Sequence, residues 1–218
     1  MSDLTYKIIH HLGYPAFWTS SSPVVLHRDR VPRRGAFILA ANHLSPYDVP
    51  CLIATVPRNL DFMSVVEFLR KPLVAWLFRQ TNVFFLDRGR VDPAAVRTVL
   101  DRLRRGRVVA LFPEGRIRDE AESVTRGGPF KPGVARLARL SGAPVLPVVI
   151  LGTAAYSRFT SWLPLRRTKY GVNFGEPITF RADMPPDAAE QQFLDRLKRA
   201  WLDLADELRR ALPPPPDP

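Results

Sequence analysis

The sequence contains a single cysteine, Cys51, among its 218 residues. No disulfide can form within the chain, so the fold suits a reducing compartment or does not depend on redox state. The sequence also has no H-E-x-x-H segment and no paired C-x-x-C, and it lacks the G-x-S-x-G, Walker A and G-x-G-x-x-G patterns. These absences predict a reaction that uses no metal, no cofactor and no nucleotide-binding loop.

Long uninterrupted apolar stretches are missing as well. Residues 8–27 and 140–157 carry no Lys, Arg, Asp or Glu, but prolines and glycines interrupt both stretches. Neither is typical of a membrane-spanning helix, and the N-terminus lacks the basic start and continuous apolar segment of a signal peptide. The large apolar residues within 1–22 suit either a lipid surface or the core. We expect an interfacial helix there, on a cytoplasmic protein bound peripherally to the inner face of the membrane.

Acidic residues are outnumbered, with 21 Asp and Glu against 32 Lys and Arg, a net charge of +11 and a pI of about 10.6. Such a surface attracts anions, whether nucleic acid, acidic lipid or phosphorylated small molecules. A nucleic-acid-binding protein would gather its basic residues on one face with aromatic platforms or a recognition helix, whereas the charge here is spread along the chain. We therefore expect an anionic membrane surface as a partner and no nucleic acid.

Short apolar runs alternate with segments of helical periodicity. The runs predict strands at residues 24–27, 36–41, 61–65, 83–86, 108–112, 145–151 and 170–174, and helices are predicted to begin near residues 4, 46, 67, 93, 132 and 187. This alternation is typical of an α/β fold with a mixed, largely parallel sheet flanked by helices. The last segment repeats Leu197, Trp201, Leu204 and Leu208 at helical spacing, which predicts a long C-terminal amphipathic helix.

The domain organisation predicted from the same pattern is simple. No internal repeat or linker interrupts residues 1–212, so we expect a single domain over that range. The proline-rich residues 213–218 follow as a disordered tail.

The segment NHLSPYDVP, residues 42–50, directly follows a predicted strand. His43 therefore lies at the carboxyl end of that strand, the edge where α/β sheets bind ligands. Ser45 suits an N-cap and Pro46 the first helical position, which makes Asp48 the third residue of the helix. The spacing allows two interpretations. Asp48 completes a capping box with Ser45, or it folds back to hold one ring nitrogen of His43 and leave the other free as a general base.

A second group of charged residues follows other predicted strands. The segment RVVALFPEGRIR ends in a turn that contains Glu114 and Gly115, NVFFLDRGR ends in basic residues, and FKPGVARLA begins just before a predicted helix. The basic residues at these strand ends and this helix start include Arg88, Arg116, Arg118 and Lys131. Guanidinium groups close to a helix N-terminus are suited to phosphate, so these turns predict a phosphate site.

The blocks NHLSPYD, VFFLDRGR, LFPEGR and VLPVVI occur in the order found in the PlsC-type lysophospholipid and glycerolphosphate acyltransferases, over residues 37–150. The segment FKPGVARLA also lies where that family has a similar one. The sequence thus resembles this family. The resemblance implies an O-acyltransferase in which His43 takes the proton of the acceptor hydroxyl and Asp48 orients the imidazole. The hydroxyl would attack the thioester of acyl-CoA or of an acyl-carrier protein, and no acyl-enzyme would form.

The resemblance also implies where the substrates bind. Pro147, in the fourth block, would support the acyl-donor region. Lysophosphatidic acid is the expected acceptor, with glycerol 3-phosphate, another lysophospholipid, or a glycolipid or amino-lipid as alternatives. The residues expected to hold the acceptor are Asn42, Arg88, Glu114, Gly115, Arg116, Arg118 and Lys131.

One position departs from the family pattern. The family commonly reads F-P-E-G-T-R, whereas Ile117 stands at the arginine position here. Arg116 or Arg118 could bind the phosphate, and Arg116 is favoured because a neighbouring branch of the family reads P-E-G-R. Without the resemblance, Glu114 could simply satisfy nearby N–H groups, and a non-catalytic lipid-binding protein of the same fold stays an alternative.

Overall fold

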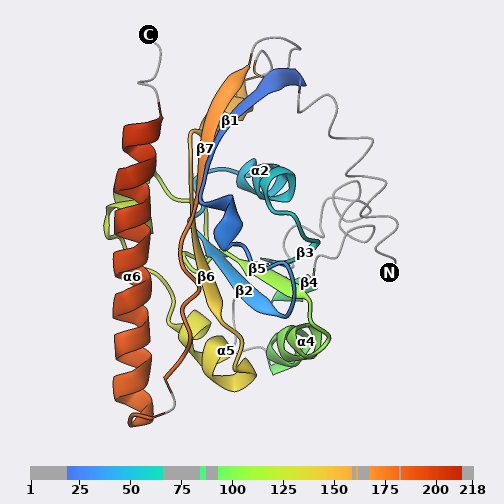
Figure 1. The fold of residues 1–218 in the computed structure, drawn as a ribbon, viewed down its shortest axis with the longest axis vertical. Coiled ribbons are helices and arrows are strands. Elements are labelled where there is room, and N and C mark those ends of the chain that lie inside the picture. Colours follow the sequence, from blue (N-terminus) through green and yellow to red (C-terminus); the bar gives the residue numbers. More distant parts are fainter. Residues whose placement is uncertain are drawn as a thin grey trace.

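The computed structural model describes residues 19–65, 84–86, 93–158, 161, 167–181 and 183–212 (Figure 1). These residues contain seven strands: β1 (Ser21–Leu26), β2 (Phe37–Ala41), β3 (Leu60–Val65), β4 (Phe84–Leu86), β5 (Val108–Leu111), β6 (Val145–Leu151) and β7 (Thr168–Phe174). They form one sheet in the order β1-β7-β6-β2-β5-β3-β4. Every neighbouring pair is parallel except β6 and β7. The predicted mixed, largely parallel sheet is confirmed.

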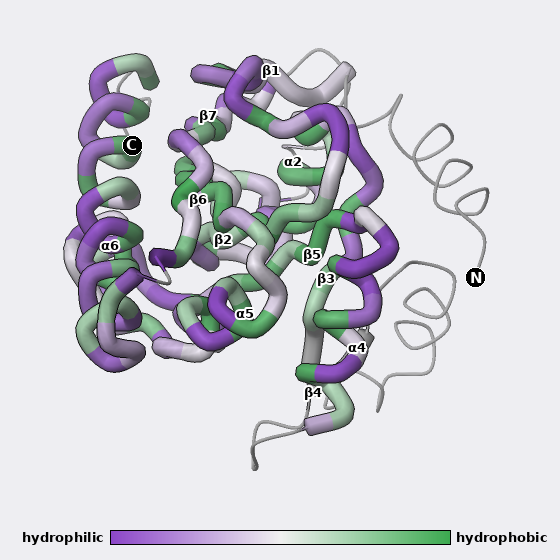
Figure 2. Tube along the Cα trace, turned by 60° about the horizontal axis from the view of Figure 1, so that its bottom comes forward, coloured by the Kyte–Doolittle hydropathy of each residue, from purple (hydrophilic) through white to green (hydrophobic). Residues whose placement is uncertain are grey.

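Helices cover both faces of this sheet. Alternate side chains of a strand point to opposite faces, so Ile38 and Ala40 of β2 enter one core while Phe37 and Leu39 enter the other. The first core packs against α4 (Pro93–Arg104), α5 (Gly133–Ser141) and α6 (Pro186–Ala211), and the second includes α2 (Asp48–Thr55). Figure 1 shows α6 and α2 on opposite sides of the sheet, and Figure 2 shows hydrophobic residues on the central strands β2 and β5 and on α2.

The long amphipathic C-terminal helix is confirmed as α6, which has 26 residues. Its buried face includes the predicted Leu197, Trp201, Leu204 and Leu208. The indole N–H of Trp201 donates to the carbonyl oxygen of Ala40 at 3.1 Å. This bond fixes α6 against the end of β2 from which His43 follows. None of the described helices combines the length and the apolar character needed to cross a bilayer.

The start of the sheet differs from the sequence prediction. β1 begins at Ser21 because Ser21 and Ser22 pair with Thr168 and Lys169 of β7. It ends at Leu26 because His27 adopts the left-handed conformation, with φ of 53°. Residues 21 and 22 therefore belong to the sheet and not to the predicted N-terminal helix. Residues 1–18 of that helix, the helix predicted near residue 67 and the tail at 213–218 lie outside the described residues.

Short 3-10 helices, which the sequence pattern did not predict, lie in the connecting segments of the described chain. They are η1 (Arg28–Arg30), η3 (Glu120–Glu122), η4 (Val124–Arg126) and η5 (Thr153–Ser157). Two of them, η4 and η5, supply hydrogen-bond donors to the residues described next.

Candidate active site

His43 and Asp48 meet at the carboxyl end of β2. Nδ1 of the His43 ring lies 2.9 Å from Oδ2 of Asp48. The same oxygen accepts the backbone N–H groups of Leu44 at 2.8 Å and Ser45 at 2.9 Å. An ionised carboxylate can only accept, so Nδ1 carries the proton, and when the ring is neutral Nε2 keeps its lone pair. The pair thus has the geometry of an oriented general base.

The turn before α2 combines both interpretations of the spacing. The Ser45 N–H bonds the Asp48 carboxylate as in a capping box, while the Ser45 hydroxyl accepts the N–H of Tyr47 at 3.2 Å. The helix begins two residues later than predicted, with Tyr47 in the N-cap position and Asp48 first in α2. The prediction of Ser45 as N-cap and Asp48 as third residue is therefore wrong. The reason is a separate turn, closed by the Asp48 N–H and the Ser45 carbonyl at 3.1 Å.

Asp48 and His43 differ in their exposure to solvent. The Asp48 side chain is 0% exposed and the His43 side chain 17% exposed. The imidazole also stacks on the ring of Phe112, with centroids 4.0 Å apart and planes 12° apart. The carboxylate is thus enclosed by donors at the positive end of α2, while the imidazole is held by two neighbours and still reaches the surface.

Glu114 connects the turn after β5 to the histidine. Its Oε2 accepts the backbone N–H of His43 at 2.6 Å. Its Oε1 accepts the Ser123 hydroxyl at 2.6 Å and the Val124 N–H at 2.8 Å, at the start of η4. The side chain is buried, and these three donors stabilise its charge. Its described contacts join three segments of the protein around His43.

The two candidate arginines differ in position. The backbone N–H of Arg118 donates to the carbonyl oxygen of His43 at 2.9 Å. The Arg118 side chain is 14% exposed against 62% for Arg116, and both reach Glu122, at 3.7 and 3.4 Å. Among the described residues, nothing bonds the buried Nε of Arg118. The geometry therefore ties the backbone of Arg118 to the histidine and leaves its side chain the more buried of the two, whereas the sequence had favoured Arg116.

Gly115 and Lys131 lie against each other. Gly115 has φ of +73°, and a Cβ placed on it would stand 2.7 Å from Cε of Lys131. The Lys131 backbone N–H donates to the Pro113 carbonyl at 2.9 Å. The lysine side chain therefore crosses the turn between Glu114 and Arg118, and the absence of a side chain at Gly115 makes room for it.

The remaining predicted residues have internal contacts or lie outside the described chain. The amide of buried Asn42 donates to the Ile150 carbonyl at 2.9 Å and accepts the Ile150 N–H at 2.7 Å. Pro147 is buried within β6, and its carbonyl accepts the Gly175 N–H at 2.9 Å. Arg88 is not among the described residues.

Three residues at this site were missed by sequence analysis. They are Phe112, which stacks on His43, Ser123, which donates to Glu114, and Thr153, whose hydroxyl donates to Oδ1 of Asp48. Phe112 directly precedes the P-E-G turn and could have been found from that position. Thr153 lies 105 residues from Asp48, and only the knowledge that β6 lies beside β2 brings it to this edge.

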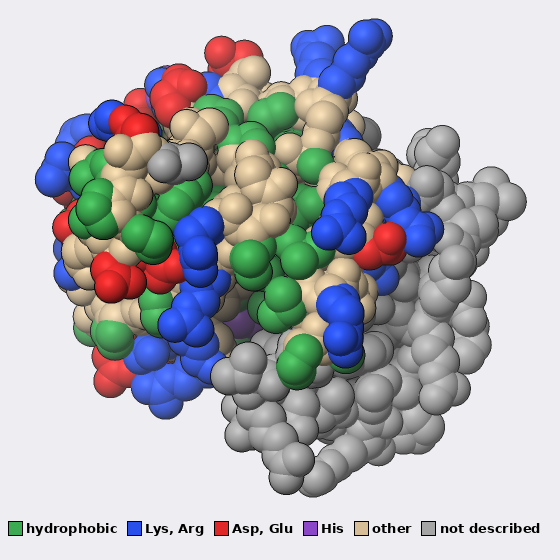
Figure 3. All heavy atoms as spheres, turned by 90° about the horizontal axis from the view of Figure 1, so that it is seen from below, with side chains coloured by type: hydrophobic (Ala, Val, Ile, Leu, Met, Phe, Trp, Pro, Cys, Tyr) green, Lys and Arg blue, Asp and Glu red, His purple; other side chains and the backbone are tan. Residues whose placement is uncertain are grey.

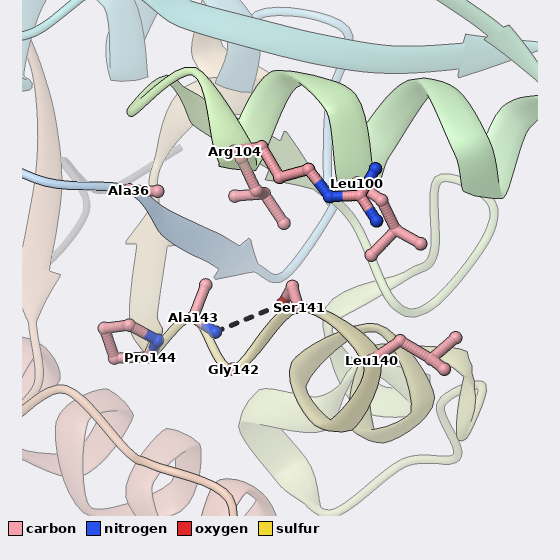
Figure 4. A pocket seen from close by; sticks show the side chains of 9 residues that line it. Ala36, Leu100, Arg104, Leu140, Ser141, Gly142, Ala143 and Pro144 are labelled. Carbon is pink, nitrogen blue, oxygen red and sulfur yellow. Dashed lines mark hydrogen bonds between the residues drawn. The ribbon is translucent and has the colours of Figure 1, made fainter.

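Other features of the described chain lie apart from the histidine. Burial raises the pKa of the Cys51 thiol, and the negative charge of Asp48 raises it further. Within the described ranges, no group of three or more His, Cys, Asp or Glu side chains could hold a metal ion. A hollow of about 300 Å³ between α4 and α5 is bordered by Ala36, Leu140 and Pro144 (Figure 4). It lies at the amino ends of β2 and β6, away from His43.

Comparison with known proteins agrees with this site. Residues 23–151, more than half of the chain, match the family model described as Acyltransferase. The chain therefore belongs to the acyltransferase family and is an acyltransferase, and the PlsC-type resemblance is confirmed. It is similar to the crystal structure of the 1-acyl-sn-glycerophosphate (LPA) acyltransferase, PlsC, from Thermotoga maritima, with a TM-score of 0.69 and 27% identity over 93% of this chain and 79% of that one.

Curated relatives carry similar names. The 1-acyl-sn-glycerol-3-phosphate acyltransferase of Bacillus subtilis (strain 168) is 23% identical over 71% of this chain and 72% of its own length. The enzyme of that name from Streptococcus pneumoniae is 24% identical over 79% of this chain and 62% of its own length.

Proposed function

We propose that the protein transfers a fatty acyl group from an acyl thioester to the free hydroxyl of lysophosphatidic acid, with His43 as the general base. The observation that carries the proposal is the His43 ring bonded through Nδ1 to the buried Asp48 carboxylate. The curated relatives, named as 1-acyl-sn-glycerol-3-phosphate acyltransferases, support this choice of acceptor.

The reaction needs no covalent enzyme intermediate. Nε2 of His43 accepts the proton of the acceptor hydroxyl while the hydroxyl oxygen bonds to the thioester carbon. The C–S bond then breaks, and the imidazolium returns the proton to the departing thiolate, which leaves an ester and a free thiol. Asp48 stabilises the imidazolium throughout, and general-base help of this kind contributes about 10²–10⁴-fold. The thiol belongs to coenzyme A or to an acyl-carrier protein.

Arg118 is the residue we propose for the acceptor's phosphate. Its backbone bond to His43 holds it beside the base, and its buried Nε has no partner within the described part of the chain. A guanidinium forms paired, charge-assisted bonds to phosphate. Lys131, which crosses the neighbouring turn, would add a second positive charge.

The membrane supplies the acceptor in this proposal. Ile117 is 43% exposed and lies between Arg116 and Arg118. On the face shown in Figure 3, Lys and Arg side chains lie beside hydrophobic ones. Exposed apolar and basic side chains together suit the surface of an anionic bilayer. We propose peripheral binding at the inner face of the membrane.

A panel of acceptors tests the function. Purified protein with oleoyl-CoA, or with an oleoyl-acyl-carrier protein in its place, is assayed for free thiol in the presence of lysophosphatidic acid, glycerol 3-phosphate, lysophosphatidylcholine or a monoacylglycerol. The proposal predicts the highest kcat/KM with lysophosphatidic acid. A preference for the phosphate-free acceptor would overturn the acceptor assignment, and thiol release with an acyl-carrier-protein donor alone would identify the donor.

A further inference from the structure

The two oxygens of the Asp48 carboxylate have different surroundings. Oδ2 accepts the His43 ring and two backbone N–H groups of the adjoining turn. Oδ1 accepts the hydroxyl of Thr153, which comes from η5 at the far end of β6. Both side chains are fully buried. The Thr153 hydroxyl is thus the donor that the described residues supply to Oδ1, on the side away from the histidine.

The chain path explains why a hydroxyl arrives at this point. β6 lies beside β2 in the sheet, so the residues after β6 and after β2 share one edge. Gly152 turns the chain there with φ of +83°, and a Cβ on it would stand 3.2 Å from the Lys169 carbonyl oxygen. Glycine is the residue suited to such a close left-handed turn, and Thr153 follows it directly.

Contacts on either side of Thr153 hold it in place. Before it, Asn42 clamps the backbone of Ile150 through both polar atoms of its amide. After it, the buried Tyr156 bonds Ser21 through its hydroxyl and packs edge-on against Tyr170, with ring centroids 6.0 Å apart. The hydroxyl of Thr153 is therefore part of the rigid sheet framework and not of a loose loop.

We propose that Thr153 is a positioning residue for the acyl transfer, fixing the rotation of the Asp48 carboxylate so that Oδ2 stays aimed at His43. The inference rests on the proposed role of His43 as base. Rotation about the Cβ–Cγ bond moves both oxygens together, so a donor on Oδ1 adds to the resistance that the donors on Oδ2 already give. Without the hydroxyl, Oδ1 would be a buried, negatively charged acceptor lacking that donor, and the carboxylate that orients the imidazole would be held less firmly.

Paired substitutions test this role. Thr153→Val keeps the shape of the side chain and removes the hydroxyl, while Thr153→Ser keeps the hydroxyl. Thr55→Val is the matched control, because Thr55 is buried in α2 and its hydroxyl bonds the Cys51 and Leu52 carbonyls without touching Asp48. Steady-state kcat, both KM values and Tm are measured for each variant, beside wild type and His43→Ala.

The proposal predicts that Thr153→Val lowers kcat by about 10–100-fold, the equivalent of a lost hydrogen bond to a charged group, with both KM values within about threefold. Thr153→Ser recovers most of kcat, and Thr55→Val stays near wild type. Wild-type kcat in Thr153→Val, no recovery in Thr153→Ser, or an equal loss in Thr55→Val would each overturn it. Full activity in His43→Ala would instead reject His43 as the base, the part of the proposed function on which this inference rests.

Discussion

The backbone N–H of His43 lies 2.6 Å from Oε2 of Glu114. The position of the histidine therefore depends on a buried carboxylate from the turn after β5, as well as on the ring contact with Asp48. The resemblance had assigned Glu114 to acceptor binding, whereas its contacts with Ser123 and Val124 favour a supporting role.

The substitution Glu114→Gln separates these two roles. An amide NH₂ would replace one acceptor oxygen and face a donor, so we expect kcat to fall about 10–100-fold and the free energy of unfolding to fall by about 1–3 kcal/mol. The KM for the acceptor should change little. Glu176→Gln, at an exposed glutamate paired with Arg30, is the control. A higher acceptor KM at unchanged kcat would support acceptor binding instead.

Arg118 and Arg116 should respond differently to substitution by glutamine. Because Arg118 lies beside His43, Arg118→Gln is expected to raise the KM for lysophosphatidic acid by about 10–100-fold, the value of a hydrogen bond to a charged group. Arg116→Gln should stay within about threefold of wild type. A monoacylglycerol has no phosphate, so its turnover should be equal in both variants. A larger rise in this KM for Arg116→Gln than for Arg118→Gln would instead assign phosphate binding to Arg116.

Gly115→Ala would push Lys131 away from the turn and strain a backbone with φ of +73°. Gly35 has φ of +77°, but a Cβ there would meet nothing within 4 Å, so Gly35→Ala carries the strain alone. Each is expected to lower the free energy of unfolding by about 1 kcal/mol. Acceptor KM should rise in Gly115→Ala and stay unchanged in Gly35→Ala, as measured by steady-state kinetics and thermal unfolding. Equal acceptor KM values in the two variants would argue against a role for Lys131 in binding the phosphate.

Cys51 should be inert in the folded protein. Burial and the charge of Asp48 both raise its pKa, and the thiolate is the reactive form. Iodoacetamide should therefore leave the native thiol unmodified and the activity intact at neutral pH, and should modify the thiol after denaturation, as read by mass spectrometry. Rapid native alkylation with loss of activity would argue for a thiol in the reaction and against a histidine base.

Local patterns predicted those parts of the site that are close in sequence. Spacing alone brought His43 and Asp48 together as one of two possibilities, because a five-residue separation can be closed by a single turn. The apolar runs predicted β2 and β5, whose ends carry His43 and Glu114.

The remaining parts depend on tertiary neighbours. Thr153 reaches Asp48 across 105 residues, which requires the order of strands in the sheet. Ser21 and Ser22 have no local preference for a strand and join β1 because β7 offers a pairing edge. Arg116 was favoured over Arg118 because a neighbouring branch of the family reads P-E-G-R, whereas in the folded turn it is the backbone N–H of Arg118 that bonds His43.

Two histidine substitutions, compared in one assay of oleoyl-CoA turnover with lysophosphatidic acid, test directly whether His43 is the base. His43→Ala removes the proposed base. His27→Ala removes a histidine that bonds Glu207 on α6 and has no contact with Asp48 in the described chain. If His43 is the base, kcat falls by about 10²–10⁴-fold in His43→Ala and stays within about threefold of wild type in His27→Ala. Wild-type kcat in a folded His43→Ala protein would contradict that role.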